Sequence, residues 1–143
     1  MDVGVIGVGA MGRNHVRVYS EMKGVGTVYV YDPVPENAER SREFATICKS
    51  LQELLARVDA VSICVPTRYH FDTAKKVIEA EINCLIEKPI TLTAAEGVQL
   101  TSIIEGKELV VGVGHIERFN PIVEEMTKIA QRPDYVSIKR HNP

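Results

Sequence analysis

The sequence lacks an excess of charge of either sign. Its 17 basic and 19 acidic side chains give a net charge of −2, and the basic residues form no continuous run. Nucleic-acid-binding domains carry a basic patch or stripe that neutralises phosphates. The composition therefore gives no indication of a nucleic-acid partner.

Long apolar runs are also missing. The uninterrupted apolar stretches have the length of a strand, whereas a membrane-spanning helix needs roughly 20 apolar residues. The N-terminus enters an expected strand almost at once, without the charged segment and apolar core of a signal peptide. We therefore expect no membrane partner and a cytoplasmic location.

Cysteine is scarce. Cys48, Cys64 and Cys84 are an odd number, form no C-x-x-C pair, and two of them lie within apolar runs. A disulfide framework needs paired cysteines, and a zinc site needs closely spaced ligands. We interpret the three side chains as buried free thiols in a reducing compartment and expect no metal site.

What the 143 residues do contain is an alternation of short β-branched runs with helical patterns. Apolar runs without polar alternation are typical of strands in a parallel sheet covered by helices on both faces. The predicted fold is therefore α/β, a doubly wound Rossmann domain over residues 1–132. Its six strands are expected at 3–6, 28–31, 46–48, 61–65, 83–86 and 109–113.

Helices are expected at 11–19, 35–44, 51–57, 71–80 and 94–105. Two of them open on capping boxes, Ser50-x-x-Glu53 and Thr93-x-x-Glu96, in which a hydroxyl and a carboxylate satisfy free backbone N–H groups. Asn120-Pro121 predicts the start of a further helix. The final segment, 135–140, has the pattern of an extra terminal strand.

Three glycines, Gly7-x-Gly9-x-x-Gly12, lie between the first expected strand and the first helix. Gly7 permits a tight turn, Gly9 lets a pyrophosphate approach the backbone, and Gly12 lets the helix pack close to the strand. Ala10 and Met11 lie at the start of the expected helix, whose N-terminal N–H groups favour phosphate. The glycines alone do not distinguish a dinucleotide site from that of an S-adenosylmethionine-dependent methyltransferase.

Asp32 ends the second expected strand, 20 residues beyond Gly12. A carboxylate there accepts both hydroxyl protons of an adenosine ribose and repels a 2′-phosphate. No Arg follows immediately, because the next residues are Pro33, Val34 and Pro35, so NAD is favoured over NADP. The structural alternative is that Asp32 only starts a turn before Pro33.

Two later stretches, VPTRYH (65–70) and EKP (87–89), follow the fourth and fifth expected strands. The carboxyl ends of parallel strands open on the ligand crevice of such a sheet. We therefore expect both stretches to converge on the nicotinamide end of the cofactor. Thr67, His70 and Lys88 are the side chains expected to face it, and Val65 is expected beside the cofactor at the end of the fourth strand.

These motifs resemble the N-terminal domain of the glucose–fructose oxidoreductase and inositol dehydrogenase family. The matching stretches are GVGAMGRNH (7–15), VPTRYH (65–70), IEKP (86–89), TxxE (93–96) and VGHIERFNP (113–121). GHIERFNP is similar to the form found in sugar-nucleotide dehydrogenases, such as those that oxidise the 3-hydroxyl of UDP-N-acetylglucosamine. A methyltransferase has no role for EKP or RFNP.

The resemblance implies that Lys88 is the catalytic lysine, whose ammonium binds the oxygen of a secondary alcohol and relays its proton. It also implies a cis Lys88–Pro89 bond. Pro66 and Thr67 would line the nicotinamide ribose, with Glu87 at the cofactor.

Three side chains in these motifs have structural alternatives. His70 either braces its helix or contacts the cofactor. His15 is interpreted as structural. Arg118 either reaches a phosphate or pairs with a surface acid such as Glu117.

Full-length members of this family carry a second α/β domain, which supplies most substrate contacts and a second catalytic residue. We expect residues 133–143 to begin that domain, with 135–140 as its entering strand. The isolated chain is then expected to be nearly inactive on a sugar or sugar-nucleotide alcohol, because the substrate lacks its positioning groups. An unpaired terminal strand would also favour a homo-oligomer. The alternative is a non-catalytic NAD(H)-binding regulatory or partner module.

Overall fold

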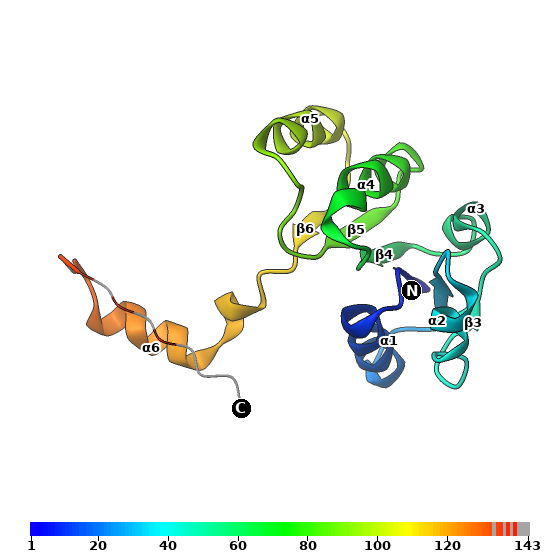
Figure 1. Cartoon of the computed structure of the whole chain (residues 1–143), viewed down its shortest axis with the longest axis horizontal. Coiled ribbons are helices and arrows are strands. Elements are labelled where there is room, and N and C mark those ends of the chain that lie inside the picture. Colours follow the sequence, from blue (N-terminus) through cyan, green and yellow to red (C-terminus); the bar gives the residue numbers. More distant parts are fainter. Residues whose placement is uncertain (133, 136, 138, 140–143) are drawn as a thin grey trace.

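The computed structural model describes residues 1–132, 134, 135, 137 and 139, and it contains one six-stranded parallel sheet (Figure 1). The strands lie in the order β3-β2-β1-β4-β5-β6. This order runs outward from β1 in both directions, so the doubly wound fold is confirmed. The strands are β1 (Val3–Ile6), β2 (Val28–Tyr31), β3 (Thr46–Ile47), β4 (Ala60–Ile63), β5 (Asn83–Ile86) and β6 (Val111–Val113).

Helices connect these strands. The α-helices are α1 (Ala10–Glu21), α2 (Pro35–Glu39), α3 (Leu51–Leu55), α4 (His70–Glu79), α5 (Ala94–Ile104) and α6 (Pro121–Ile129). Two 3-10 helices, η1 (Thr67–Tyr69) and η2 (Ile116–Phe119), follow β4 and β6. Both expected capping residues are confirmed, since the Glu53 N–H donates to Ser50 Oγ and the Glu96 N–H to Thr93 Oγ1.

The register of the sheet aligns the ends of five strands. Ile6 pairs with Tyr31 on one side and Ile63 on the other, and the row continues through Ile86 to Val113. The next residue of each strand therefore leaves the sheet at the same edge. These next residues are Gly7, Asp32, Cys64, Glu87 and Gly114.

Two apolar clusters cover the faces of the sheet. One gathers Val5 and Val30 with Val16 of α1, and the other gathers Ile63 with Val77 of α4 and further side chains of α3 and α5. All of these named residues are almost fully buried. Burial of each such side chain is worth about 1.5–3 kcal/mol, which fixes the sheet and with it the edge where the loops meet.

Some predicted boundaries were wrong. The helix expected at 35–44 ends at Glu39, because the next N–H groups bond three residues back: Ser41 N donates to the Ala38 oxygen, and Arg42 N to the Glu39 oxygen. The last expected strand begins at Val111 rather than 109. Before it, the Val110 N–H donates to the side chain of Asn83 instead of to a strand backbone.

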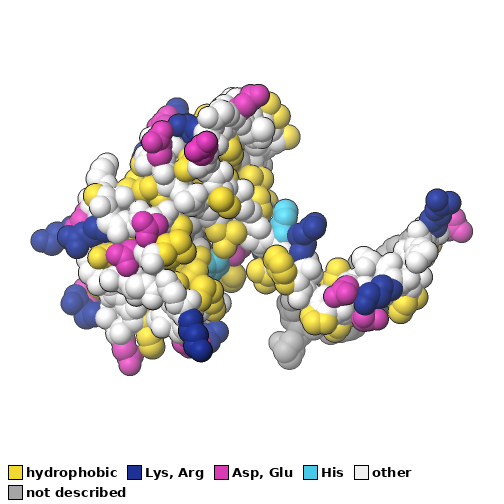
Figure 2. Space-filling model, turned by 180° about the vertical axis from the view of Figure 1, so that it is seen from behind, with side chains coloured by type: hydrophobic (Ala, Val, Ile, Leu, Met, Phe, Trp, Pro, Cys, Tyr) yellow, Lys and Arg dark blue, Asp and Glu magenta, His cyan; other side chains and the backbone are white. Residues whose placement is uncertain are grey.

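Asn120 caps α6 as predicted, since its Oδ1 accepts from the Ile122 N–H. Beyond η2 the chain leaves the body of the domain, and apolar side chains of α6 remain exposed (Figure 2). The strand predicted at 135–140 includes residues 136, 138 and 140, which lie outside the described residues, so it stays a prediction. None of the helices in the described residues is long and apolar enough to cross a bilayer.

The three cysteines are free thiols, with Cys48 and Cys84 buried and Cys64 half-buried. Burial raises the pKa of the Cys84 thiol to about 11. Burial and the nearby Glu87 carboxylate together raise the pKa of Cys64 from 9.0 to about 12. The thiolate is therefore disfavoured at both positions in the folded protein.

This predicts a loss of stability in alkali. A pKa that is higher in the folded than in the unfolded chain stabilises the fold fully below the unfolded value, and this contribution is lost as the pH rises through the folded value. The free energy of unfolding should fall between pH 9.0 and about 12, as measured by denaturant titration. The Cys64→Ala variant should lose less of its stability over that range. An identical loss in the variant and the unaltered chain would contradict this account.

Candidate functional site

The glycine turn after β1 combines two structural glycines with one open position. Gly7 has φ +85°, and a Cβ there would lie 2.8 Å from the Val65 nitrogen. A Cβ on Gly12 would collide with the Gly7 carbonyl oxygen. A Cβ on Gly9 would meet nothing within 4 Å. Gly7 and Gly12 therefore let the turn and α1 pack together, and Gly9 leaves space in front of the helix N-terminus.

Asp32 holds this turn from the neighbouring strand. Its Oδ2 accepts from the Val8 N–H at 2.7 Å, and its Oδ1 accepts from the Val34 N–H at 2.9 Å and from Asn37 Nδ2 at 3.3 Å. Asp32 does begin a turn, as the structural alternative held. A carboxylate has about four acceptor positions, so one remains for a ligand.

The turn and Asp32 border a cavity of about 980 Å³. This volume lies at the upper end of the range for small-molecule and cofactor sites. Seven of the residues predicted to bind a cofactor line it: Gly7, Gly9, Ala10, Met11, Asp32, Val65 and Pro66. Gly12, Thr67, His70, Glu87 and Lys88 are not among its lining residues.

Sequence reasoning missed the wall opposite Asp32. Residues of η1 and α4 form it, namely Arg68, Tyr69, Asp72, Thr73 and Lys76. Their spacing in the sequence places them along one side of the helical segment that begins after VPT. That spacing was the available signal. The wall adds two basic side chains, Arg68 and Lys76, and one acidic side chain, Asp72, to the cavity.

Lys88 lies in the exposed loop after β5, and the Lys88–Pro89 bond is cis, as the resemblance implies. Within the described part of the chain, no ion pair occupies its ammonium. The amine is therefore available to a ligand at the edge of the sheet.

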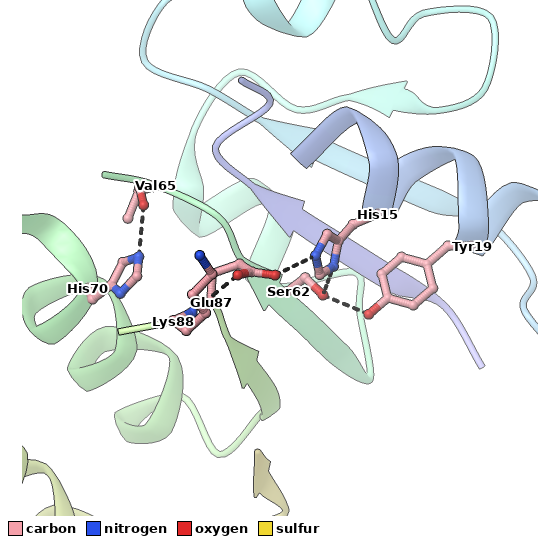
Figure 3. Close-up of polar contacts among 7 residues, drawn as sticks. All are labelled: His15, Tyr19, Ser62, Val65, His70, Glu87 and Lys88. Atoms are coloured by element: carbon pink, nitrogen blue, oxygen red, sulfur yellow. Dashed lines mark hydrogen bonds and ion pairs between the residues drawn. The ribbon is translucent and has the colours of Figure 1, made fainter. Parts of the chain in front are cut away.

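His70 connects the two loops expected at the nicotinamide end. Its side chain is enclosed, with the residue only 1% exposed. Nε2 lies 2.8 Å from the Val65 oxygen (Figure 3), and Nδ1 lies 2.8 Å from the Pro89 oxygen. Both partners are acceptors, so both contacts are hydrogen bonds only when both ring nitrogens carry protons. These contacts support the bracing role, and a cofactor contact stays a prediction.

Glu87 also faces inward. Its Oε1 lies 3.0 Å from His15 Nε2, while Oε2 accepts from the Lys88 N–H at 3.1 Å (Figure 3). His15 Nδ1 in turn lies 3.0 Å from Ser62 Oγ. The interpretation of His15 as structural agrees with these contacts.

Arg118 is exposed in η2 and is absent from the lining of the large cavity. It borders a separate hollow of about 570 Å³ with residues of α6. Its two sequence alternatives, phosphate contact and pairing with an acid, stay predictions. Among the described residues, His, Cys, Asp and Glu side chains form no group of three or more that is able to hold a metal ion.

Comparison with known proteins agrees with this arrangement. Residues 1–115 match the family described as "Oxidoreductase family, NAD-binding Rossmann fold", which is the glucose–fructose oxidoreductase and inositol dehydrogenase family. The chain belongs to this family. The whole chain is 38% identical to UDP-N-acetylglucosamine 3-dehydrogenase of Acidithiobacillus ferrooxidans and spans 46% of that protein. Its solved structure superposes with a TM-score of 0.80 over 90% of this chain and 41% of that one.

Other family members are more distant in sequence. An inositol 2-dehydrogenase of Corynebacterium glutamicum is 28% identical over 92% of this chain and 41% of its own length. GenD2 from gentamicin A biosynthesis, solved in complex with NAD, is 28% identical with a TM-score of 0.84 over 91% of this chain and 38% of that one. The chain thus spans less than half the length of the relatives it matches, and it corresponds to their NAD-binding domain.

The glycines of this NAD-binding domain yield a matched pair of variants. Gly12→Ala should lower the melting temperature strongly, because its methyl group collides with a backbone oxygen that cannot move away. Gly9→Ala should melt close to the unaltered chain but lose dinucleotide affinity, because its methyl group fills the open space that a pyrophosphate would occupy. Thermal melting and ligand titration measure both effects. A stable Gly12→Ala, or undiminished binding by Gly9→Ala, would contradict these assignments.

Proposed function

We propose that this chain is the NAD-binding half of an oxidoreductase that transfers a hydride between a nicotinamide and a secondary alcohol of a sugar or sugar nucleotide. The observation that carries the proposal is the shared edge of the sheet. The glycine turn, Asp32 and Lys88 all follow strands that end in one row, and a cavity of about 980 Å³ opens there.

The residues at this edge fit a dinucleotide. The space in front of Gly9 and the free N–H groups of α1 suit a pyrophosphate, which the helix dipole favours. Asp32 has acceptor capacity left for the hydroxyls of an adenosine ribose. Its negative charge opposes a 2′-phosphate, so we infer NAD rather than NADP. The NAD complex of GenD2 supports this choice.

Lys88 would supply the acid–base chemistry of the protein at the nicotinamide end of the site. When bound, the nicotinamide accepts or returns the hydride. In alcohol oxidation the neutral Lys88 amine would accept the hydroxyl proton as the hydride leaves, and in the reverse direction the Lys88 ammonium would donate that proton to the carbonyl oxygen and stabilise its negative charge. Its exposed position suits that task, as does the absence of an ion pair at its ammonium among the residues that the structure describes.

The names of relatives support the substrate class. UDP-N-acetylglucosamine 3-dehydrogenase and inositol 2-dehydrogenase both act on secondary hydroxyls of polyhydroxylated rings. Because the chain spans less than half of each relative, turnover would require the substrate contacts that the other half provides. We infer that the isolated chain binds the dinucleotide but has little activity.

Fluorescence titration tests the proposal. The chain should bind NADH with saturation, NADPH should bind more weakly, and S-adenosylmethionine should not displace NADH. Asp32→Asn should reduce the preference for NADH over NADPH by about tenfold or more, because hydrogen bonds to a charged group are worth about 1.5–3 kcal/mol.

Asp72→Asn is the matched control, because Asp72 is a second carboxylate lining the same cavity from the opposite wall. It should leave the preference unchanged. Melting curves of both variants separate lost recognition from lost folding, since Asp32 also holds the glycine turn. Displacement of NADH by S-adenosylmethionine, or an unchanged preference in Asp32→Asn, would overturn the proposal.

A further inference from the structure

A line of polar side chains crosses the domain from the first helix to the loop of Lys88. Tyr19 and His15, one turn apart on α1, both contact Ser62 of β4: Tyr19 Oη lies 2.6 Å and His15 Nδ1 lies 3.0 Å from Ser62 Oγ (Figure 3). The other ring nitrogen of His15 lies 3.0 Å from Glu87 Oε1. The line then reaches the Lys88 backbone, whose N–H donates to Glu87 Oε2 at 3.1 Å.

Every contact in this line has a donor and an acceptor. One assignment that satisfies every contact has His15 Nε2–H donating to Glu87, Ser62 donating to His15 Nδ1 and Tyr19 donating to Ser62. Ser62 is fully buried and Glu87 is only 6% exposed, so loss of a partner would leave a polar group without compensation.

The carboxylate of Glu87 has little freedom to turn. A Cβ on Gly114, which follows β6, would lie 3.0 Å from Glu87 Oε1 and 3.4 Å from Oε2, so a glycine backbone closes that side. The His15 ring and the Lys88 N–H hold the two oxygens. The position of His15 therefore determines where the carboxylate lies, and the carboxylate holds the first peptide of the Lys88 loop.

We propose that His15 is a positioning residue that couples the phosphate end of the site to Lys88. It stands on α1, whose N-terminus faces the proposed pyrophosphate, and its ring transmits the position of that helix to Glu87 and the Lys88 backbone. The coupling rests on the proposed dinucleotide function. Because coupling between sites is reciprocal, ordering of the Lys88 loop would also favour occupation of the glycine turn.

Two substitutions of His15 separate the contact of its ring with Ser62 from the contact with Glu87. His15→Gln places an amide N–H near the position of Nε2 and keeps a donor for Glu87. His15→Asn is shorter, reaches only toward Ser62 and leaves Glu87 without its donor. His15→Met separates the hydrogen bond from the filling of space, because methionine fills about the volume of glutamine without an amide donor: it should behave like His15→Asn if the bond to Glu87 matters and like His15→Gln if only volume does.

The first readout needs no ligand. Amide hydrogen exchange at Lys88 should be about ten-fold faster in His15→Asn than in the unaltered chain, because its acceptor is no longer held. His15→Gln should restore most of the protection. Tyr19→Phe removes a hydrogen bond of the same line without touching Glu87, so it should leave the Lys88 amide protected and serves as the control for general loosening.

The second readout uses ADP, which carries the two phosphates but no nicotinamide and so does not reach the far end directly. Addition of ADP should shift the Lys88 amide signal in a nitrogen–proton NMR spectrum of the unaltered chain and of His15→Gln. In His15→Asn the shift should be lost while ADP still perturbs the glycine turn. His115→Gln, which alters an exposed histidine outside the line, should behave like the unaltered chain.

The two proposals fail in different ways. If neither ADP nor NADH binds the unaltered chain, the dinucleotide function falls and the coupling falls with it. If both bind and His15→Asn keeps the Lys88 protection and shift, the function stands and the positioning role is overturned. Should His15→Asn fail to fold, His15→Met removes the same donor at closer to the original volume, and an unchanged Lys88 amide there would likewise overturn the role.

Discussion

The parallel register of the sheet determines where everything else can lie. Because β1 pairs in step with both β2 and β4, and β4 in step with β5, the last residues of these strands form one row. A shift of one residue between two strands would turn every side chain of one strand to the opposite face and move its loop. The glycine turn, Asp32 and the EKP loop meet because backbone hydrogen bonds and apolar faces hold that register.

The polar side chains at this edge mainly contact backbone N–H and carbonyl groups of the loops. Asp32 binds the N–H of Val8, His70 lies against two carbonyl oxygens, and Glu87 binds the N–H of Lys88. Asp32 and His70 each join loops that follow different strands, and Glu87 joins the Lys88 loop to α1 through His15, so these bonds give the cleft its shape without a ligand. A site that is already ordered loses little further freedom on binding, which favours both affinity and accurate placement of reacting groups.

The sequence predicted the strands, the glycine turn and Asp32 because each depends on local chemistry: apolar runs, a left-handed Gly7, and a carboxylate at a strand end. It did not predict that Arg68, Tyr69 and Lys76 line the cavity, since this depends on which face η1 and α4 turn toward the glycine turn once they pack on the sheet. The inward orientation of Glu87 also depends on three elements far apart in the chain, α1, β5 and the end of β6. Helix 35–44 was too long because the pattern of its residues does not reveal the change to tighter turns after Glu39.

The proposed function requires one dinucleotide that extends along this edge from the glycine turn toward Lys88. A crystal structure of the chain with NADH tests it most directly. The account predicts the adenosine ribose at Asp32, the phosphates in the space before Gly9, and the nicotinamide on the side of Lys88. A cofactor bound in the reverse direction, or at any surface other than the carboxyl edge of the sheet, would contradict it.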